Sequence, residues 1–279
     1  MSTIKLEDRD GNTKFFEVAG TGTEADPFVP AFGGKDANLE IPSGRMAGYS
    51  SVNKFGANHE VAANTTEDVW GGGGTYTYPT TADITHLSQA VDQAAMRDKT
   101  IFIQGLDANW DLIEQSKNLD ATNTTTLVAL DTPLIRLFRM RVLANVVGDQ
   151  DIKVTNSAGT VLYGIMAAGD NKSLMAQYTI PNGKTGYLTQ WEVSSVKTTA
   201  SDPRNIEIRL WTADRDAGYE FELKHASSLN GIGESGFIHT LNPYSKITQK
   251  TDIKITVSPT INPADAHAGF DLILEDNPA

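Results

Sequence analysis

The chain has 279 residues and no cysteine, and its 35 acidic side chains outnumber its 23 basic ones to give a net charge of −12. The absence of cysteine excludes disulfides, a thiolate nucleophile and zinc sites built on cysteine. The negative charge repels the phosphate backbone of nucleic acids, so we expect no nucleic-acid partner. Apolar residues make up 39% of the sequence, so the chain should fold. Without disulfides, its stability must come from burial and from assembly.

The first residues, Met1–Asp8, contain no basic start followed by an apolar run, so we expect no signal peptide. No segment approaches the roughly 20 apolar residues that a membrane span requires. We therefore expect a protein that is synthesised in a cytoplasm and that has no membrane partner.

Residues 1–33 are expected to form a small unit that contains a β-hairpin. Asp10-Gly11 is a strong hairpin-turn signal just before a strand-like segment, Thr13–Val18. The loop that follows ends in a segment flanked by Pro27 and Pro30. Because proline donates no ladder hydrogen bond, that segment can only be an edge strand.

Residues 34–68 are rich in Gly, Asn and Ser and show little periodicity, which favours an extended arm. A structureless stretch of this length is unusual inside a compact domain, so we expect it to lie across a neighbouring subunit. The predicted organisation is an N-terminal hairpin and extended arm over residues 1–68 and a β-sandwich region over residues 69–279. The latter forms either one body or two packed sub-domains that divide near residue 148.

From residue 69 onward, short stretches of alternating apolar and polar residues recur with turn signals between them. This pattern indicates an all-β fold, an antiparallel β-sandwich or jelly roll. The expected strands cover residues 101–104, 134–143, 152–155, 161–165, 174–180, 186–196, 206–211, 219–223, 252–257 and 270–274.

Two of these expected strands carry polar or aromatic side chains whose faces can be assigned. The alternation over residues 134–143 places Arg136 on the apolar face and both Arg139 and Arg141 on the other. Over residues 186–196, the same rule places Tyr187, Thr189, Trp191 and Val193 together on one face.

Two segments resemble binding loops but lack the residues that such loops need. Gly71–Gly74 would require a following Lys and Ser/Thr to bind phosphate, and Thr75–Pro79 follows instead, so we expect a tight turn or hinge. Asp8–Asn12 resembles the start of a calcium loop, but its glycine stands at the fourth position rather than the sixth. Ala19 would occupy the closing ligand position, so a hairpin turn is the better interpretation.

The remaining candidates have structural explanations. Glu220 and Glu222 share one strand face opposite Tyr219 and Phe221, which is typical of a solvated face opposite a core face. Five histidines are too dispersed to form a metal pair on one element, although convergence across strands stays open. Six aromatic residues could form a sugar platform, but aromatic residues on strands are more often core. We predict no catalytic residue, metal or cofactor. The histidines are His59, His86, His225, His239 and His267. The aromatic residues are Trp70, Tyr76, Tyr78, Trp110, Trp191 and Trp211.

Several motifs, in the same order, resemble tailed-bacteriophage virion proteins that are common in marine and environmental phages. The resemblance spans about residues 66–277, and residues 20–30 also resemble N-terminal pieces of other phage structural proteins. The arm at residues 34–68 departs from the family pattern. The motifs are Gly105–Asp111, Thr132–Met140, Ala168–Tyr187, Lys250–Lys254 and Ala268–Leu274.

The resemblance implies a virion structural protein, which is not an enzyme and is made in the host cytoplasm. We expect a capsid decoration (cement) protein that binds the major capsid protein on the exterior of the head as a homotrimer. The negative charge suits an outer surface better than one that faces DNA. The alternative is a tail or head-fibre component that recognises a host-surface glycan, and a polysaccharide-cleaving enzyme is a third possibility.

Residues 84–97 leave two interpretations open. Apolar residues at positions 84, 87, 91, 94 and 95 fit one helical face. The resemblance to phage virion proteins instead implies a strand or an irregular segment.

Overall fold

The computed structural model describes residues 2–7, 13–19, 23, 29–30, 36–144, 146–197, 205–230 and 235–278. The chain divides into two units, residues 1–50 and 51–279. The described residues are mostly strand, joined by antiparallel pairing, with one short helix, α1 (Ala37–Glu40), and one 3₁₀ helix, η1 (Ala94–Met96). The predicted all-β class is confirmed.

The first unit contains a three-stranded sheet in the order β1-β2-β3. β1 (Ser2–Glu7) and β2 (Thr13–Ala19) form an antiparallel hairpin, as predicted, and β3 (Val29–Pro30) pairs with β2 at the edge. The turn signal at Asp10-Gly11 and the segment Asp8–Asn12 lie outside the described residues.

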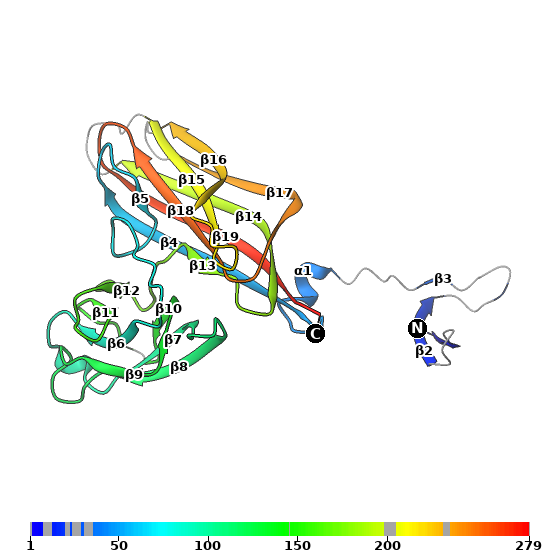
Figure 1. Cartoon of the computed structure of the whole chain (residues 1–279), viewed down its shortest axis with the longest axis horizontal. Helices are drawn as coiled ribbons and strands as arrows, with labels where there is room; N and C mark the ends of the chain where they lie inside the picture. The colour runs from blue at the N-terminus through cyan, green and yellow to red at the C-terminus, as the bar shows by residue number, and fades with distance from the viewer. Residues whose placement is uncertain are drawn as a thin grey trace. The chain divides into compact units, whose positions relative to one another are not determined.

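The second unit contains a large sandwich of two antiparallel sheets that enclose one core (Figure 1). One sheet has the order β13-β18-β15-β16 with β5 also paired to β18, and the other has the order β17-β14-β19-β4. The bounds are β4 (Tyr49–Val61), β5 (Glu67–Asp68), β13 (Gln177–Thr179), β14 (Lys184–Lys197), β15 (Asn205–Asp214), β16 (Glu222–Asn230), β17 (Ser235–Ile247), β18 (Thr251–Pro259) and β19 (Ala264–Asp276).

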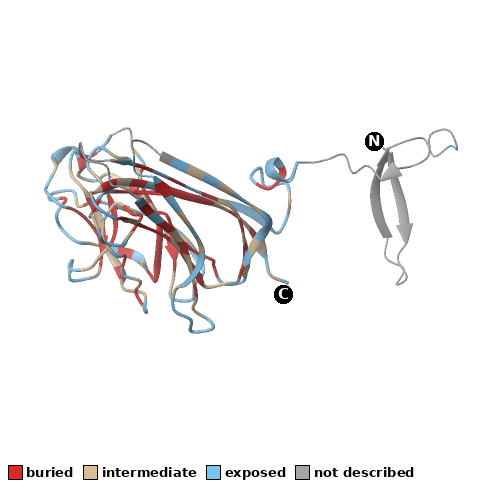
Figure 2. Cartoon of the chain, turned by 90° about the horizontal axis from the view of Figure 1, so that it is seen from above, coloured by how far each residue is buried: buried red, intermediate tan, exposed pale blue. Residues whose placement is uncertain are grey.

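Alternation explains how this sandwich forms. On β15, Ile206, Ile208 and Leu210 are buried, whereas Glu207 is exposed and Arg209 is partly exposed between them. Successive side chains on a strand point to opposite faces, so the apolar set enters the core and the charged set meets solvent. In Figure 2, most of the buried residues lie on the strands, whereas exposed residues lie on the loops and on part of the strands.

A smaller pair of sheets surrounds a second core within the same unit (Figure 1). Their orders are β10-β7-β8 and β12-β11-β6-β9. The bounds are β6 (Ile84–Gln89), β7 (Thr100–Leu106), β8 (Leu112–Asn118), β9 (Val128–Leu134), β10 (Arg136–Val142), β11 (Ile152–Thr155) and β12 (Leu162–Met166).

Strand β10 supplies side chains to both cores. Leu137 and Met140 pack in the small core, whereas Phe138 packs in the large one. The pairing of β10 with β7 shifts register between Leu137 and Arg139. Such a bulge re-aims consecutive side chains, so the strict alternation predicted here holds only in part. Arg136 is buried as expected, while Arg139 is half-buried.

Two predicted boundaries differ from the structure. Residues 49–61 of the expected arm form β4, which pairs with β19 in the large sandwich, so the unit boundary falls at residue 50 rather than 68. A division near residue 148 would cut the sheet in which β11 pairs with β6. The small core is instead an insertion between β5 and β13, and residues 51–279 remain one unit.

Residues 84–97 are strand followed by a 3₁₀ turn, as the family resemblance implied, and not a helix. Ile84 and Leu87 are both fully buried, although an odd spacing should place them on opposite faces. The pairing of β6 with β9 shifts register between Ile84 and His86, which brings both side chains into the core. Val91 is largely exposed.

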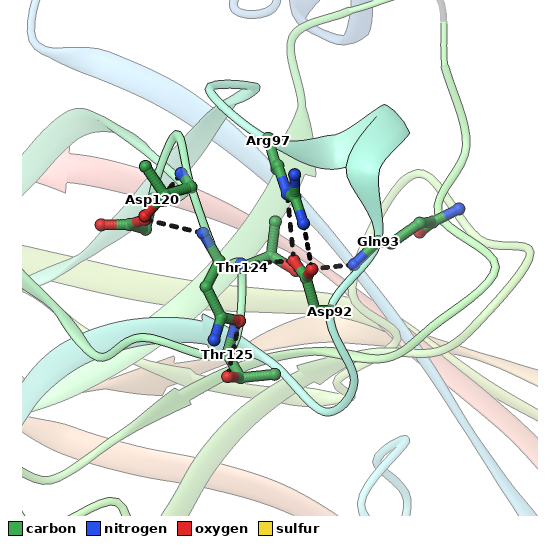
Figure 3. A network of polar contacts seen from close by, with 8 residues as sticks. Asp92, Gln93, Arg97, Asp120, Thr124 and Thr125 are labelled. Atoms are coloured by element: carbon green, nitrogen blue, oxygen red, sulfur yellow. Dashed lines mark hydrogen bonds and ion pairs between the residues drawn. The ribbon is translucent and has the colours of Figure 1, made fainter.

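A polar network fixes the loop around η1 (Figure 3). The Asp92 carboxylate binds the guanidinium of Arg97 and accepts a hydrogen bond from the Thr124 backbone N at 2.9 Å. The Thr124 hydroxyl in turn accepts from the Gln93 backbone N at 3.0 Å. The bonds from Arg97 and Thr124 lower the pKa of Asp92 to about 2. The loop is therefore held by its own polar groups.

Candidate interaction surface

The large sandwich is incompletely closed along one side, where the edge strands β16 and β17 meet. β16 ends one sheet and β17 ends the other. The inward-facing residues of β17, Phe237, His239 and Leu241, are only half-buried, and most of β16 is exposed. We call the side formed by residues 219–230 and 236–247 the open seam.

Large apolar side chains lie uncovered on this open seam. Ile238 is 66% exposed, Leu223 52% and Tyr244 48%, and Tyr219 precedes β16 at 55%. Charged groups border them, including Glu222, Lys224 and Lys246. Exposed apolar side chains beside charged ones, on the edge strands of two sheets, are typical of surfaces that take part in protein contacts.

Three rings fill the gap inside the open seam. The His225 and His239 rings lie 4.4 Å apart between centroids, and Trp191 packs edge-on against both. Burial, and secondarily the nearby His239, lower the pKa of His225. The fold therefore brings two of the five dispersed histidines together, in one packed cluster with Trp191.

The other histidines do not complete a metal site. His59 and His267 form a second ring pair at 5.7 Å, and His86 contacts the Thr85 hydroxyl. Within the described ranges, no group of three or more His, Cys, Asp or Glu side chains is placed to hold a metal ion.

The glycine run forms a tight turn, as predicted. Gly73 and Gly74 have positive φ angles of 66° and 63°, which favour glycine. Glu67 accepts a hydrogen bond from the Gly74 backbone N at 2.7 Å, so the turn is closed by a carboxylate rather than open to a phosphate.

The predicted strand with a solvated face, Glu220 and Glu222, opposite a core face is only partly confirmed. Glu220 and Glu222 are exposed, but Tyr219 opposite them is exposed too and belongs to no core. The reason is that β16 begins at Glu222, so residues 219–221 precede the strand. Phe221 lies near two cations, with the Lys254 Nζ 4.5 Å from its ring centroid.

The six candidate aromatic residues do not share one platform. Trp70 and Tyr76 belong to the small core and Trp191 to the large one. Tyr78 and Trp110 flank the buried guanidinium of Arg136, whose Cζ lies 5.1 and 4.8 Å from their ring centroids. The core interpretation therefore describes most of them.

The fold and the open seam define a class: an all-β sandwich protein with an uncovered apolar edge.

No helix in the described part of the chain has the length and apolar character that a membrane crossing needs. Comparisons with protein families and with curated proteins find no match.

Solved structures show only faint likeness. The PBSX exported protein XepA is 12% identical, with 96% of this chain and 98% of that chain covered, at a TM-score of 0.18. The infectious bursal disease virus Gt strain and the infectious bursal virus derived T=1 particles are 9% and 11% identical. The match to the Gt strain covers 83% of this chain and 78% of that chain, and the match to the T=1 particles covers 87% and 79%. Both have a TM-score of 0.20. Scores this low establish no shared fold, so the function is argued from the residues.

Proposed function

We propose that this chain is a phage virion structural protein, a decoration protein that binds the exterior of the head and stabilises the shell. The observation that carries the proposal is the open seam, where two edge strands leave large apolar side chains uncovered. A protein whose role is assembly needs such a surface, whereas an enzyme needs convergent reactive groups. The role is structural rather than catalytic.

The partners in this proposal are the major capsid protein and further copies of the chain, as a homotrimer. A standard interface buries about 800 Å² on each partner. A trimer on a threefold site gains by multivalency, so each contact can be modest. Binding that favours the assembled shell over its separated subunits stabilises it by linkage.

Charge supports the exterior position. The chain carries a net charge of −12, which disfavours contact with packaged DNA and keeps the protein soluble before it joins a finished shell.

Copy number tests this proposal against the fibre or tail alternative. In purified virions, the band of this protein on a stained gel should correspond to hundreds of copies relative to the major capsid protein. A few tens of copies, at a tail or vertex by immunogold labelling, would instead support a host-recognition component.

A further inference from the structure

A groove of about 620 Å³ crosses the outer face of the sheet β17-β14-β19-β4. Its volume lies in the range of small-molecule sites. Apolar side chains border it, namely Phe55, Leu174 and Ile238, and polar groups of Glu192, Ser194 and His267 line it as well.

Glycine contributes to the shape of this face of the sheet. Gly236, which lines the groove, pairs with Ser194 and carries no side chain to fill the space beside it. Gly269 follows the lining residue Ala268 and pairs with Glu192. A Cβ on Gly269 would come within 2.7 Å of the Lys54 backbone O, so the close approach of β4 requires glycine there.

Lys172 lies at the border of the groove, through its contact with Phe55, and three further cations lie close to Lys172 or to the strand that carries Phe55. The Lys172 Nζ lies 5.6 Å from the ring centroid of Phe55, and Arg139 donates a hydrogen bond to the Asn53 backbone O at 2.9 Å. The backbones of Arg141 and Lys172 form an isolated antiparallel β-bridge. The buried ammonium of Lys54 donates a hydrogen bond to the Phe138 backbone O.

These cations lack counter-charges. Among the described residues, no carboxylate lies within ion-pair distance of Arg139, Arg141 or Lys172. Burial lowers the pKa of Lys172, and the neighbouring Arg139 and Arg141 lower it further. Burial likewise lowers the pKa of Lys54, with added repulsion from Arg139 and Lys172. Cations without a nearby carboxylate, gathered in a chain of net charge −12, make this part of the surface favourable for an anion.

We propose that the groove binds an acidic saccharide. The carboxylate or sulfate group would meet Lys172, a pyranose ring would lay its C–H face on Phe55, and hydroxyls would bond Ser194, Glu192 and His267. The cations select an anion, and the apolar wall beside polar groups selects a sugar ring over a simple ion. This binding is a property of the isolated protein and is tested on it. Ile238 borders the groove and also belongs to the open seam, so the groove variants are made at Phe55 and Lys172, which lie outside the seam.

Isothermal titration of the full-length protein tests this site with two pairs of probes. Oligogalacturonate is compared with its methyl-esterified neutral form, and a sulfated dextran oligomer with unsulfated dextran. We expect binding of at least one acidic probe, weakened by salt, and at least about tenfold weaker binding of its neutral counterpart.

Variants assign the binding to the groove. Lys172→Gln and Phe55→Ala should each weaken it by about tenfold, whereas Lys117→Gln and Leu112→Ala, which change a cation and a half-exposed apolar residue on β8, should not. Unchanged melting temperatures confirm that the variants fold. The proposal is overturned if neither acidic probe binds at millimolar concentration, or if the neutral forms bind equally well. It is also overturned if both groove variants bind the acidic probe as tightly as wild type does. Binding of poly-glutamate as tight as that of the saccharides would overturn it too, because it would identify a peptide site.

Discussion

Arg136 and Asp252 form a buried two-point ion pair that joins β10 of the small core to β18 of the large one. Nε of Arg136 lies 2.7 Å from Oδ1 of Asp252, and Nη2 lies 2.9 Å from Oδ2. The same carboxylate accepts hydrogen bonds from the Thr179 hydroxyl at 2.6 Å and from Nε of Arg215 at 2.7 Å. The Asp252 side chain is fully buried, so these donors replace its entire hydration.

Replacing Asp252 with asparagine should destabilise the protein by about 3–5 kcal/mol, because it leaves the guanidinium of Arg136 buried without a counter-charge. The control is Asp131→Asn, which removes an exposed partner of Lys117 and should cost less than about 1 kcal/mol. Urea denaturation measures both. Equal losses in the two variants would show that the buried pair does not hold the two cores together.

The unit boundary predicts the outcome of two truncations. Deleting residues 1–48 should leave a folded body, because residues 51–279 form a unit of their own. Deleting residues 1–68 should lower the melting temperature sharply or abolish folding, since it removes β4 and β5 with the buried Ala57 and Val61. Circular dichroism melting distinguishes them. Equal stability of the two truncations would mean that β4 is dispensable.

Particle binding by the protein that lacks residues 1–48 tests the role of the first unit. We expect the protein that lacks residues 1–48 to bind particles poorly, because a separate small unit adds a second point of attachment. Undiminished binding would assign attachment to the body alone.

Substitution on the open seam should affect assembly and not folding. Ile238→Asp and Leu223→Asp place a charge where the isolated chain is already exposed, so the melting temperature of the monomer should change little. Both should weaken self-association in analytical ultracentrifugation and binding to particles by tenfold or more. Ile261→Asp, at a residue 54% exposed outside the seam, is the matched control. Comparable loss in the control would show that the seam has no special role.

The Asp92 network predicts an acid-sensitive loop. The pKa of the Asp92 carboxyl falls from an ordinary value of 3.8 to about 2 in the folded state. A depressed carboxylate pKa stabilises the folded state above the unfolded value, and this stability is lost as the pH falls from about 4 through 2. The difference in melting temperature between wild type and Asp92→Asn should therefore be present at pH 5 and shrink towards pH 2. A difference that stays constant over this range would contradict the assignment.

The strands with clean alternation could be predicted from sequence, and the polar exceptions could not. Residues 206–211 and 252–257 lie within β15 and β18, as expected. The sequence pattern does not predict β4, because Lys54 and Asn58 are polar yet buried, which breaks the alternation. Their partners, the Phe138 and Asp68 carbonyls, come from other strands and leave no local signal.

Bulges explain the misassigned faces. Alternation predicts Tyr187 on the same face as Trp191, but Leu188 is buried there and the Tyr187 hydroxyl instead donates a hydrogen bond to Glu275. The pairing of β14 shifts register between Leu188 and Gln190, which reverses the faces on one side of the shift. The pairing of Arg136 with Asp252, 116 residues apart, and the meeting of β16 with β17 at the open seam depend on tertiary topology and were beyond the sequence pattern.

Heat-induced DNA release from virions measures the proposed role most directly. Particles that lack this protein should assemble but release DNA at a lower temperature than wild type, and purified wild-type protein should restore the release temperature while Leu223→Asp, a seam variant outside the groove, should not. Particles that are as heat-resistant as wild type without the protein, yet fail to adsorb to cells, would contradict a decoration role and support host recognition.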